Sequence, residues 1–501
     1  MFRTVLIANR GEIACRIAAT LRTMGVRSVA VCSEADRGAR HTRVADDVRV
    51  LGPAEPRASY LDVEALLEAA RSSGAQAVHP GYGFLAENAD FAAAVEAAGL
   101  TFIGPAPEHI RAAGDKRAAR AVAERVSVPV VPGAGGADVA ALATAARAIQ
   151  YPVMVKAALG GGGKGMRIVT GEAELAEAVE STRRLALAGF GDDAVYLEKH
   201  VEKPRHVEVQ VLGDGRGEAI HLFERDCSLQ RRHQKVIEEC PAPAVDDELR
   251  GRLVTAAVAF ARALKYRGAG TVEFLLGKGG AFWFLEMNTR LQVEHPVTEM
   301  VTGLDLVRLQ LEQAVEGALP LAQSEVVRRG HAIEARIYAE DAARNFLPQA
   351  GIAARVRWPQ GPFVRVDAGV ESGDQVPVHY DPILAKVVAA GMTREAALAR
   401  LAWALDESLV HGVVTNLPFL RAVVRAHSMT RAEVDTEWVE REFLAGFAAV
   451  AGAPAPELAL AAAALFEAAG NSQASRGAGD DSRPARADAF QAAGRWRLPG
   501  L

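Results

Sequence analysis

The sequence predicts an α/β protein made of three successive folded regions and a tail. Three observations lead to this prediction. Strand-like and helical segments alternate along residues 1–113, strands punctuated by glycine fill much of residues 114–330, and an alternating pattern followed by a helical one occupies residues 331–447. The first pattern is typical of a parallel sheet with crossover helices, and the last is typical of an α+β region with a mostly antiparallel sheet.

The N-terminal region shows the clearest alternation of strands and helices. Short apolar runs are strand-like at residues 5–8, 29–32 and 77–79, and helical periodicity is present at residues 13–24 and 63–72. Strands that alternate with helices in this way connect through right-handed crossovers into a parallel sheet. We therefore expect a Rossmann-like domain over residues 1–113.

The central region, residues 114–330, begins with a helix at Asp115-Lys116 and carries a glycine-rich loop. The loop, Gly160-Gly161-Gly162-Gly163-Lys164-Gly165, joins two strand-like runs at residues 152–157 and 166–169. A dinucleotide-binding turn would lead into a helix, and a Walker A loop would need Ser or Thr at position 165. A glycine loop between two strands instead resembles a flap whose backbone N–H groups cover phosphates.

Two interpretations of this loop stay open from its residues alone: a phosphate-covering flap and a flexible surface hairpin. Lys156 favours the flap, because a lysine in an otherwise apolar strand is costly to bury without an anionic partner. We expect the surrounding residues, about 132–204, to form a separate lobe that could close.

The most informative stretch of the chain runs from Glu286 to Pro296. Polar or charged side chains occupy every second position, namely Glu286, Asn288, Arg290, Gln292 and Glu294. In an extended chain these side chains share one face, which would carry carboxylates, amides and a guanidinium together. Such a face suits a hard cation beside an anion better than it suits a solvated strand, which is the alternative interpretation.

A second strand precedes this stretch and strengthens the prediction. Residues 271–276 are rich in β-formers, residues 277–280 are typical of a turn, and residues 282–286 return as a strand. If the loop has an even number of residues, Glu273 and Glu286 become cross-strand neighbours. Facing carboxylates repel each other unless a cation lies between them, and carboxylate and amide oxygens suit Mg²⁺ or Mn²⁺. The hairpin therefore predicts a metal–nucleotide site.

The region 331–447 is expected to be α+β. Hydrophobic and polar residues alternate at residues 332–337 and 364–366, and residues 393–405 have helical periodicity. Within the first of these strands the alternation places Glu334 and Arg336 on one face, where an ordinary ion pair between them is one possibility.

The tail, residues 448–501, differs in composition from the rest of the chain. It is rich first in Ala and Pro and then in Gly, Ser, Asp and Arg. A polar segment of this kind cannot bury enough apolar surface to order itself, so we expect a linker that is partly disordered.

Bulk properties exclude several classes of function. A chain of 501 residues allows several domains, and 50% hydrophobic with 24% charged residues is ordinary for a soluble protein. The net charge of −5 gives no reason to expect nucleic acid, and no apolar run is long enough for a membrane span. The first strand follows Met1 too closely for a signal or transit peptide, and the four cysteines lack metal or redox spacing, so we expect a cytoplasmic protein with reduced thiols.

Several motifs, in one collinear order from Met1 to about Phe447, resemble those of the biotin carboxylase family, whose nucleotide site is of the ATP-grasp type. They are Asn9-Arg10-Gly11-Glu12-Ile13-Ala14, His79-Pro80-Gly81-Tyr82-Gly83-Phe84-Leu85-Ala86-Glu87-Asn88, His233-Gln234-Lys235-Val236, Glu286-Met287-Asn288-Thr289-Arg290 and Tyr380-Asp381-Pro382. The α subunits of acyl-CoA carboxylases are most similar, on Ala335-Arg336-Ile337-Tyr338-Ala339-Glu340-Asp341 and His379-Tyr380-Asp381-Pro382.

The resemblance implies that ATP and bicarbonate form carboxyphosphate and ADP, and that CO₂ then passes to N1′ of biotin. It implies that phosphates meet Lys116 and Lys156 and that the hinge from Glu198 to Val201 faces adenine. The full set of implied ATP contacts is Lys116, Lys156, Gly160, Gly161, Gly162, Gly163, Lys164, Gly165, Glu198, Lys199, Val201, His206, His233, Glu273 and Glu286. Lys164 departs mildly from the family pattern, because other members carry Arg there.

The resemblance also assigns the reacting groups. Mg²⁺ or Mn²⁺ is implied at Glu273, Glu286 and Asn288, and bicarbonate and biotin at Lys235, Arg290, Gln292, Val293, Glu294 and Arg336. Among these, Lys235, Arg290, Glu294 and Arg336 are the implied catalytic residues. Glu294 is the implied base toward bicarbonate, and Arg336 is the implied cation beside the developing enolate of biotin.

The implied partners are a biotin carrier domain or protein and a carboxyltransferase subunit, which would select the acyl-CoA. A homodimer or a larger complex is also implied. No Met-Lys-Met biotinylation motif occurs in the chain, so we expect biotin to be supplied in trans.

Two other functions stay open. They are an ATP-grasp ligase that joins an activated carboxylate to an amine, and a catalytically silent scaffold. The bicarbonate cluster and Arg336 argue against the first. The retention of costly buried charges argues against the second.

Overall fold

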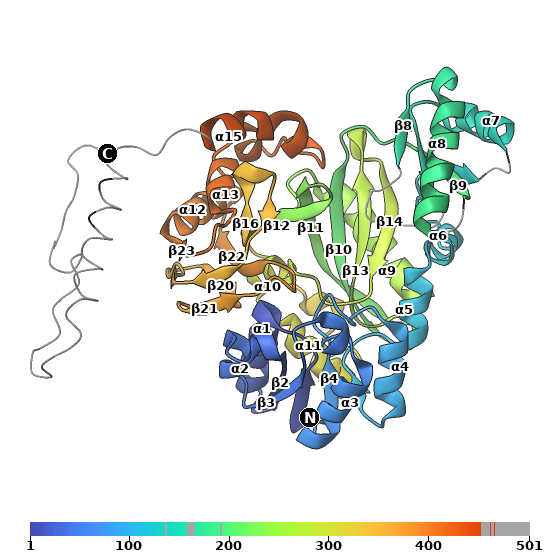
Figure 1. The fold of residues 1–501 in the computed structure, drawn as a ribbon. Helices are drawn as coiled ribbons and strands as arrows, with labels where there is room; N and C mark the ends of the chain where they lie inside the picture. The colour runs from blue at the N-terminus through green and yellow to red at the C-terminus, as the bar shows by residue number, and fades with distance from the viewer. Residues whose placement is uncertain (136–137, 158–165, 191–192, 452–460, 462–464, 466–501) are drawn as a thin grey trace, which may run out of the picture. The chain divides into compact units, whose positions relative to one another are not determined.

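The computed structural model describes residues 1–135, 138–157, 166–190, 193–451, 461 and 465. The chain divides into two compact units, Met1–Ala448 and Ala449–Leu501. The predicted glycine loop from Gly160 to Gly165, with Lys164, lies outside the described residues, as does most of the predicted tail. The elements of the first unit are labelled in Figure 1.

The N-terminal region forms the predicted parallel sheet. Its strand order is β3-β2-β1-β4-β5, and every paired strand in it runs parallel. Alternate residues of β1 cover both faces: Val5 and Ile7 pack with α1, and Leu6 packs with α3. The elements are β1 (Thr4–Ile7), α1 (Gly11–Thr23), β2 (Arg27–Ser33), α2 (Arg40–Val44), β3 (Asp47–Gly52), α3 (Val63–Ser73), β4 (Ala77–His79), α4 (Ala89–Ala97), β5 (Thr101–Phe102) and α5 (Pro107–Gly114).

The lobe predicted for residues 132–204 contains a four-stranded sheet of its own, in the order β6-β9-β7-β8. The strands on the two sides of the glycine loop, β7 and β8, pair antiparallel with Val153 opposite Val169. Two helices pack on the sheet through a small apolar core that includes Leu142, Leu175 and Leu197. The elements are β6 (Gly133–Gly135), α7 (Val139–Ile149), β7 (Val153–Ala157), β8 (Arg167–Val169), α8 (Glu172–Phe190) and β9 (Val195–Lys199), preceded by α6 (Lys116–Arg125).

An eight-stranded sheet occupies the middle of the first unit, in the order β14-β13-β10-β11-β12-β15-β22-β20. All of its neighbouring strands are antiparallel. Because β12 pairs with β15, the sheet continues across the boundary expected between residues 330 and 331. Its strands are β10 (Arg205–Asp214), β11 (Ala219–Arg231), β12 (Gln234–Cys240), β13 (Arg267–Leu276), β14 (Phe282–Asn288), β15 (His331–Tyr338), β20 (Val364–Ala368) and β22 (Ile383–Gly391).

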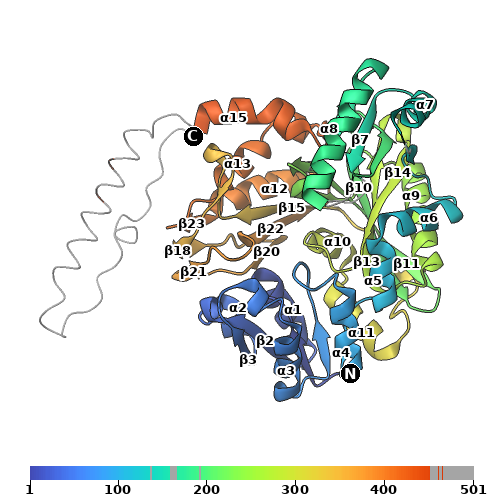
Figure 2. The ribbon, with the colours of Figure 1, turned by 45° about the vertical axis from the view of Figure 1, so that its right-hand side comes forward.

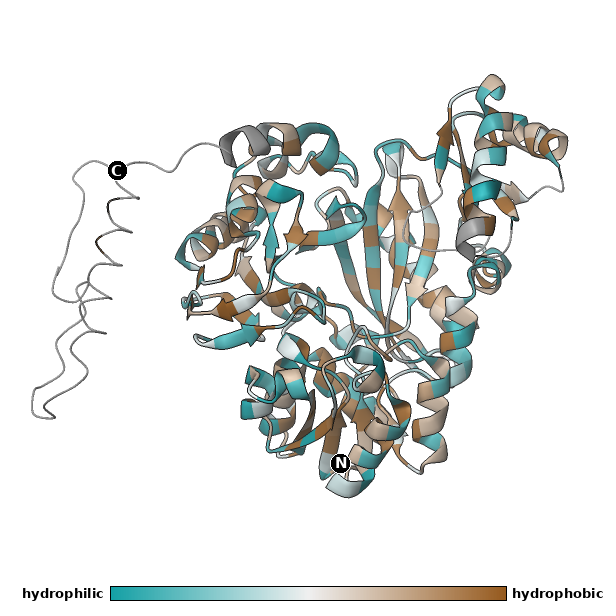
Figure 3. Cartoon of the chain, viewed as in Figure 1, coloured by the Kyte–Doolittle hydropathy of each residue, from teal (hydrophilic) through white to brown (hydrophobic). Residues whose placement is uncertain are grey.

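Helices cover this sheet on both sides. Helices α12 and α10 are labelled in Figures 1 and 2. Along β15 and β22, Ile333, Ala335 and Val387 share an apolar cluster with residues of α12, whereas Ala332 and Val388 share another with Val297 of α10. Hydrophobic and hydrophilic residues alternate along the central strands, as Figure 3 shows. The helices are α9 (Asp247–Ala263), α10 (His295–Thr302), α11 (Leu306–Glu316), α12 (Arg394–Glu407), α13 (Leu417–Val423), α14 (His427–Thr430) and α15 (Leu444–Ala451).

Short strand pairs complete the C-terminal region. They are β16 (Glu340–Asp341) with β17 (Leu347–Pro348), β18 (Gly351–Ala353) with β21 (Asp374–Val376), and β19 (Arg355–Arg357) with β23 (Leu409–His411). Among the described helices, none combines the length and the apolar character that a bilayer crossing needs.

One local prediction is wrong. The extended segment expected from Glu286 to Glu294 ends as a strand at Asn288, and α10 begins at His295 with Glu294 as its N-cap. Pro296 in the first turn favours a helix start, so the chain has to leave the sheet before Glu294. Simple alternation therefore does not explain how residues 290–294 reach the site.

Candidate active site

A row of charged side chains crosses the eight-stranded sheet. Glu286 on β14 pairs directly with Glu273 on β13, Glu273 pairs with Glu208 on β10, and Glu208 pairs with Arg225 on β11. Directly paired residues share a face of a sheet, so these four side chains project to one side. The predicted cross-strand pairing of Glu273 with Glu286 is confirmed.

Lys235 on β12 forms ion pairs with two carboxylates of this row and with a third carboxylate beside it. Its Nζ lies 2.6 Å from Glu208 Oε2 and 2.8 Å from both Glu273 Oε1 and Glu294 Oε1. Burial alone would lower the pKa of Lys235, but the three carboxylates outweigh burial and raise it well above its ordinary value. Lys235 is therefore a fixed cation at the centre of the cluster.

Arg225 offsets the negative charge of Glu208, the most buried carboxylate of the row. Its side chain is fully buried, and its Nε donates to Glu208 Oε1 at 2.6 Å. Its remaining nitrogens donate to Gln210, Thr298 and Thr271. Each nitrogen of the guanidinium thus donates at least one hydrogen bond, and the group locks the position of Glu208, which in turn holds Lys235.

Glu273 is surrounded by donors. His206 Nε2 lies 2.8 Å from its Oε2, while Asn288 Nδ2 and Gln292 Nε2 donate to its Oε1 at 2.7 and 3.3 Å. Burial would raise the pKa of Glu273, but Lys235 and His206 overcome that effect and lower it far below the ordinary value. The Glu273 carboxylate therefore stays ionised.

The predicted metal ligands fit a divalent cation by their donor chemistry. The side chain of Glu286 is exposed, yet the pKa of its carboxyl is raised, first by partial loss of water and then by the facing Glu273 carboxylate. A cation between the two carboxylates would relieve this repulsion. Asn288 turns its amide NH₂ toward Glu273, so the amide has to rotate before its oxygen can face a cation.

Among the described residues, the ligand atoms of His206, Glu208 and Glu273 lie within 4.8 Å of one another. This grouping shares only Glu273 with the predicted ligand set. Lys235 also contacts both Glu208 and Glu273, so an ammonium already lies beside this grouping.

Arg290 is oriented by the N-terminal region. Its Nε donates to Glu87 Oε2 at 2.8 Å, and the other oxygen of Glu87 accepts from the backbone N–H of Thr289 at 3.1 Å. Its Nη1 donates to Gln292 Oε1 at 3.0 Å. A bidentate carboxylate from a loop more than 200 residues away thus fixes both the main chain and the side chain of Arg290.

Arg336 on β15 meets Glu294 from the C-terminal region. Its Nη2 donates to Glu294 Oε2 at 2.9 Å, and its Nε lies 2.6 Å from Glu238 Oε1. Burial opposes ionisation of Glu294, but Lys235 and then Arg336 lower its pKa well below the ordinary value. Among the described residues, Arg336 forms ion pairs with Glu294 and Glu238. The alternative ion pair between Glu334 and Arg336 therefore does not form.

The buried carboxyl of Glu238 behaves differently from that of Glu294. Burial raises the pKa of Glu238 to about 7, and Arg336 offsets this only in part. Glu238 also faces Glu334 directly across β12 and β15, and burial raises the pKa of Glu334 well above its ordinary value. Behind Arg336 the site therefore holds carboxyls that ionise less readily than Glu294.

The predicted nucleotide residues of the lobe lie on β7, on β9 and just after it. The Lys156 ammonium donates to the carboxylate of Glu198 on the neighbouring strand. Lys199 donates to the carbonyls of Gln150 and Tyr151 at 2.9 and 3.2 Å, so its ammonium is held within the lobe itself. Val201 follows β9 in the segment that leads to β10.

Two further predicted nucleotide residues lie outside the lobe. Lys116 begins α6, and its positive charge acts on Glu286, whose raised pKa it partly offsets. His233 is exposed at the turn between β11 and β12, where its φ is 66°.

Sequence analysis missed Glu87, Glu208, Arg225 and Glu238 as parts of the site. The sequence did hold a signal for Glu208, because His206, Glu208 and Gln210 alternate with valines in one strand. The structure shows that all three of these polar residues are buried. No local pattern marks Arg225, whose partners are distant in sequence. Glu87 lies in the motif from His79 to Asn88, but nothing in that motif showed that it contacts Arg290.

Three family models together match most of the first unit. Residues 1–110 match the family model for the biotin carboxylase N-terminal domain, and residues 334–441 match the one for the biotin carboxylase C-terminal domain. Residues 115–322 match the model for the ATP-binding domain of the carbamoyl-phosphate synthase L chain.

Two curated relatives illustrate the likeness over most of the chain. The biotin carboxylase of Pseudomonas aeruginosa is 49% identical over 445 residues, which is 88% of this chain and 99% of the relative. The mitochondrial methylcrotonoyl-CoA carboxylase subunit alpha of Oryza sativa subsp. japonica is 51% identical over 441 residues, which is 87% of this chain and 60% of the relative. The chain thus spans about three-fifths of the length of such α subunits.

Solved structures show the same fold. A biotin carboxylase–β-γ-ATP complex from Campylobacter jejuni has a TM-score of 0.83 at 42% identity, covering 88% of this chain and 99% of that one. The biotin carboxylase domain dimer of Hydrogenobacter thermophilus 2-oxoglutarate carboxylase, in complex with MgADP, ADP and bicarbonate, has a TM-score of 0.81 at 40% identity, covering 88% and 97%. The resemblance inferred from the motifs is confirmed, and the chain belongs to the biotin carboxylase family of ATP-grasp ligases.

Proposed function

We propose that this chain carboxylates biotin with bicarbonate at the expense of ATP, through carboxyphosphate, as a component of an acyl-CoA carboxylase. The observation that carries the proposal is the position of Glu294, whose carboxylate lies 2.8 Å from Lys235 and 2.9 Å from Arg336. One carboxylate between two fixed cations offers a base and two anion-binding groups at a single point.

Glu294 would take the proton of bicarbonate. As it stands, Lys235 and Arg336 keep its pKa low, which makes it a weak base. A bicarbonate that binds to the same two cations would shift their hydrogen bonds away from Glu294 and add a negative charge beside it, and both effects raise its pKa. Substrate binding would therefore itself prepare the base.

Lys235 and Arg290 would stabilise the anion formed when a bicarbonate oxygen attacks the γ-phosphorus of ATP and ADP leaves. Both groups are held rigidly, Lys235 by three carboxylates and Arg290 by Glu87 and Gln292. Preorganised charges of this kind cost no reorganisation as charge develops in the transition state.

Arg336 would act in the second half of the reaction. Carboxyphosphate would break down into CO₂ and phosphate, and the phosphate would take the proton from N1′ of biotin while negative charge develops on the ureido oxygen. N1′ would then attack the CO₂. A guanidinium that is fixed by Glu294 and Glu238 could stabilise the ureido oxygen without moving. Glu273, Glu286 and Asn288 would hold Mg²⁺ or Mn²⁺, which neutralises phosphate charge when bound.

Partners follow from the relatives. The α subunits of methylcrotonoyl-CoA carboxylase suggest that a carrier presents biotin and that a carboxyltransferase receives the CO₂ group. The likeness to a biotin carboxylase domain dimer supports a homodimer. We keep a cytoplasmic location as a proposal: the relatives include a bacterial biotin carboxylase, whereas the eukaryotic methylcrotonoyl-CoA carboxylase α subunits among them are mitochondrial.

One experiment tests the function directly. The purified chain is incubated with ATP, Mg²⁺ and labelled bicarbonate, with or without free biotin or an added carrier. We expect ATP cleavage to depend on bicarbonate and biotin, and label to appear on free biotin or the carrier. ATP cleavage that ignores bicarbonate but responds to an amine acceptor would favour the other ligase activity, and a biotin-positive band at the mass of this chain would refute supply in trans.

A further inference from the structure

Lys386 is a fully buried cation in the middle of β22. Its side chain is 0% exposed, and it stands among apolar residues of that strand. A buried ammonium is costly unless several anionic or polar groups surround it. Among the described residues, Lys386 lies close to three such groups: Val293 O at 2.9 Å, Glu12 Oε2 at 3.2 Å and Asp367 Oδ2 at 3.8 Å.

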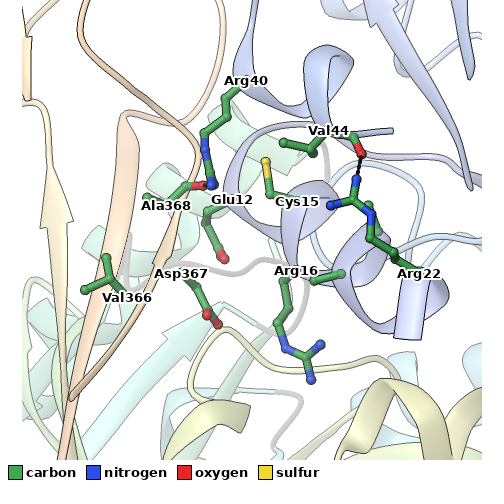
Figure 4. A pocket seen from close by; sticks show the side chains of 11 residues that line it. Glu12, Cys15, Arg16, Arg22, Arg40, Val44, Val366, Asp367 and Ala368 are labelled. Atoms are coloured by element: carbon green, nitrogen blue, oxygen red, sulfur yellow. Dashed lines mark hydrogen bonds between the residues drawn. The ribbon is translucent and has the colours of Figure 1, made fainter. Parts of the chain in front are cut away.

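The two acidic partners come from regions far apart in the sequence. Glu12 lies on α1 and Asp367 on β20, and Figure 4 shows both facing a cavity of about 190 Å³. Asp367 has a second cation, because Arg365 Nη2 lies 2.7 Å from its Oδ2. Glu12 also accepts a hydrogen bond from the Tyr82 hydroxyl. Neither carboxylate therefore depends on Lys386 alone for a polar contact.

The third partner is the main-chain carbonyl of Val293, which precedes the candidate base Glu294. Lys386 pairs directly with Arg336 across β22 and β15, so these two cations lie side by side on one face. Arg336 holds the side chain of Glu294 at 2.9 Å, and Lys386 holds the carbonyl of Val293, the preceding residue, at the same distance. Two neighbouring like charges repel each other, but together they fix the side chain and the main chain of one short segment.

We propose that Lys386 is a positioning residue, which holds the Val293–Glu294 main chain in the conformation that binds and deprotonates bicarbonate. This inference rests on the function proposed above. Without the ammonium, the Val293 carbonyl loses its donor and the segment can shift. Because a misplacement of about 1 Å can cost up to ~10²-fold in rate, we expect the KM for bicarbonate to rise about tenfold, whereas the KM for ATP stays within about twofold.

The competing explanation is that Lys386 only neutralises the buried Glu12 carboxylate. Three variants separate the two explanations: Lys386→Met, Glu12→Gln and the double variant. In the double variant no buried charge is left unpaired at Glu12, but the Val293 carbonyl still lacks its donor. Glu12→Gln alone keeps the bond from Lys386 to Val293 and should keep the parental KM for bicarbonate.

The readouts are the KM values for bicarbonate and ATP, the melting temperature, and hydrogen exchange of peptides that cover residues 289–298. A double variant with a raised bicarbonate KM and faster exchange in these peptides supports positioning. A double variant with the parental bicarbonate KM and protection overturns it, and so does a Glu12→Gln variant that raises the bicarbonate KM as much as Lys386→Met does.

Two further outcomes are informative. If the parent chain shows no bicarbonate-dependent ATP cleavage, the proposed function fails, and the exchange comparison decides the positioning role by itself. If the double variant does not fold, Lys386→Arg decides instead: it keeps a donor and should retain a bicarbonate KM closer to the parental value than Lys386→Met, and equal losses would contradict the proposal.

Discussion

Replacing Lys235 by Met tests the central feature of the site. The change keeps the length of the side chain and removes the cation that contacts Glu208, Glu273 and Glu294 at 2.6 to 2.8 Å. Removing one partner from a buried ion cluster typically costs about 3–5 kcal/mol. Each carboxylate retains another cationic or histidine partner, namely Arg225, His206 or Arg336, so we expect the lower end, about 3 kcal/mol.

The loss should depend on pH in a defined direction. In the parent, Lys235 overrides burial and depresses the pKa values of Glu273 and Glu294, so their stabilisation is present above the unfolded-state pKa of about 4.3 and is lost as the pH falls through the folded values. In the variant burial dominates and these carboxyls prefer a proton. The stability difference between parent and variant should therefore be largest near pH 8 and shrink toward pH 5.

Urea unfolding followed by fluorescence at the two pH values measures this difference. Lys278→Met is the matched control, because Lys278 is exposed in the turn between β13 and β14 and its loss should change little. Bicarbonate-dependent ATP cleavage is followed in parallel and should fall by about 10²-fold or more in the Lys235 variant, as when a preorganised electrostatic group is lost. A stability gap that stays constant with pH, or a Lys235 variant that behaves like the Lys278 variant, would refute this account of the cluster.

Three other predictions follow from the site. Glu286→Gln should weaken activation by Mg²⁺ and lower turnover by about 10²-fold, and near-normal turnover at ordinary Mg²⁺ would contradict the metal assignment. Glu294→Gln should reduce bicarbonate-dependent ATP cleavage, whereas Arg336→Ala should spare ATP cleavage more than biotin carboxylation; equal losses of both activities in both variants would show that the roles are not separate. Hydrogen exchange in residues 132–204 should slow when ATP and Mg²⁺ are added, and equal protection with and without nucleotide would count against a closing lobe.

Local patterns predicted the elements of the fold well. Three strands of the N-terminal sheet (β1, β2 and β4), the β13–β14 hairpin and the helix α12 appear where their periodicity placed them, whereas β3 and β5 of that sheet were not predicted. Each has one dominant local signal, either alternation in a strand or helical periodicity, and tertiary packing agrees with that signal. The pairing of Glu273 with Glu286 forms too, but for another reason: the loop of residues 277–281 is odd in length, and a shift in register between Glu273 and Phe274 brings the two carboxylates opposite each other.

The parts of the site that local patterns could not predict depend on contacts between distant segments. The alternation from Glu286 to Glu294 suggested one continuous strand, but the chain turns after Asn288 and reaches Lys235 through a loop and the start of a helix. Glu87 and Lys386 hold that loop from two other regions of the chain. Their motifs or strands are visible in the sequence, but nothing in a single sequence says which loop they hold.

The composition of the cluster argues that it exists for chemistry more than for stability. Glu208, Arg225 and Glu294 are completely buried, and a buried ion network of this kind is often no more stable than well-packed apolar residues of the same volume. The free-energy cost of burying this network is explained if the fixed charges act when further negative charge binds in the site. In the proposed reaction, bicarbonate and the phosphates of ATP would bring that charge, and Lys235, Arg290 and Arg336, which carboxylates already hold in place, would bind it. A site that carries its cations in place before the substrate arrives needs its own carboxylates to keep them there, and this explains why the candidate base, Glu294, is itself one of the groups that hold Lys235 and Arg336.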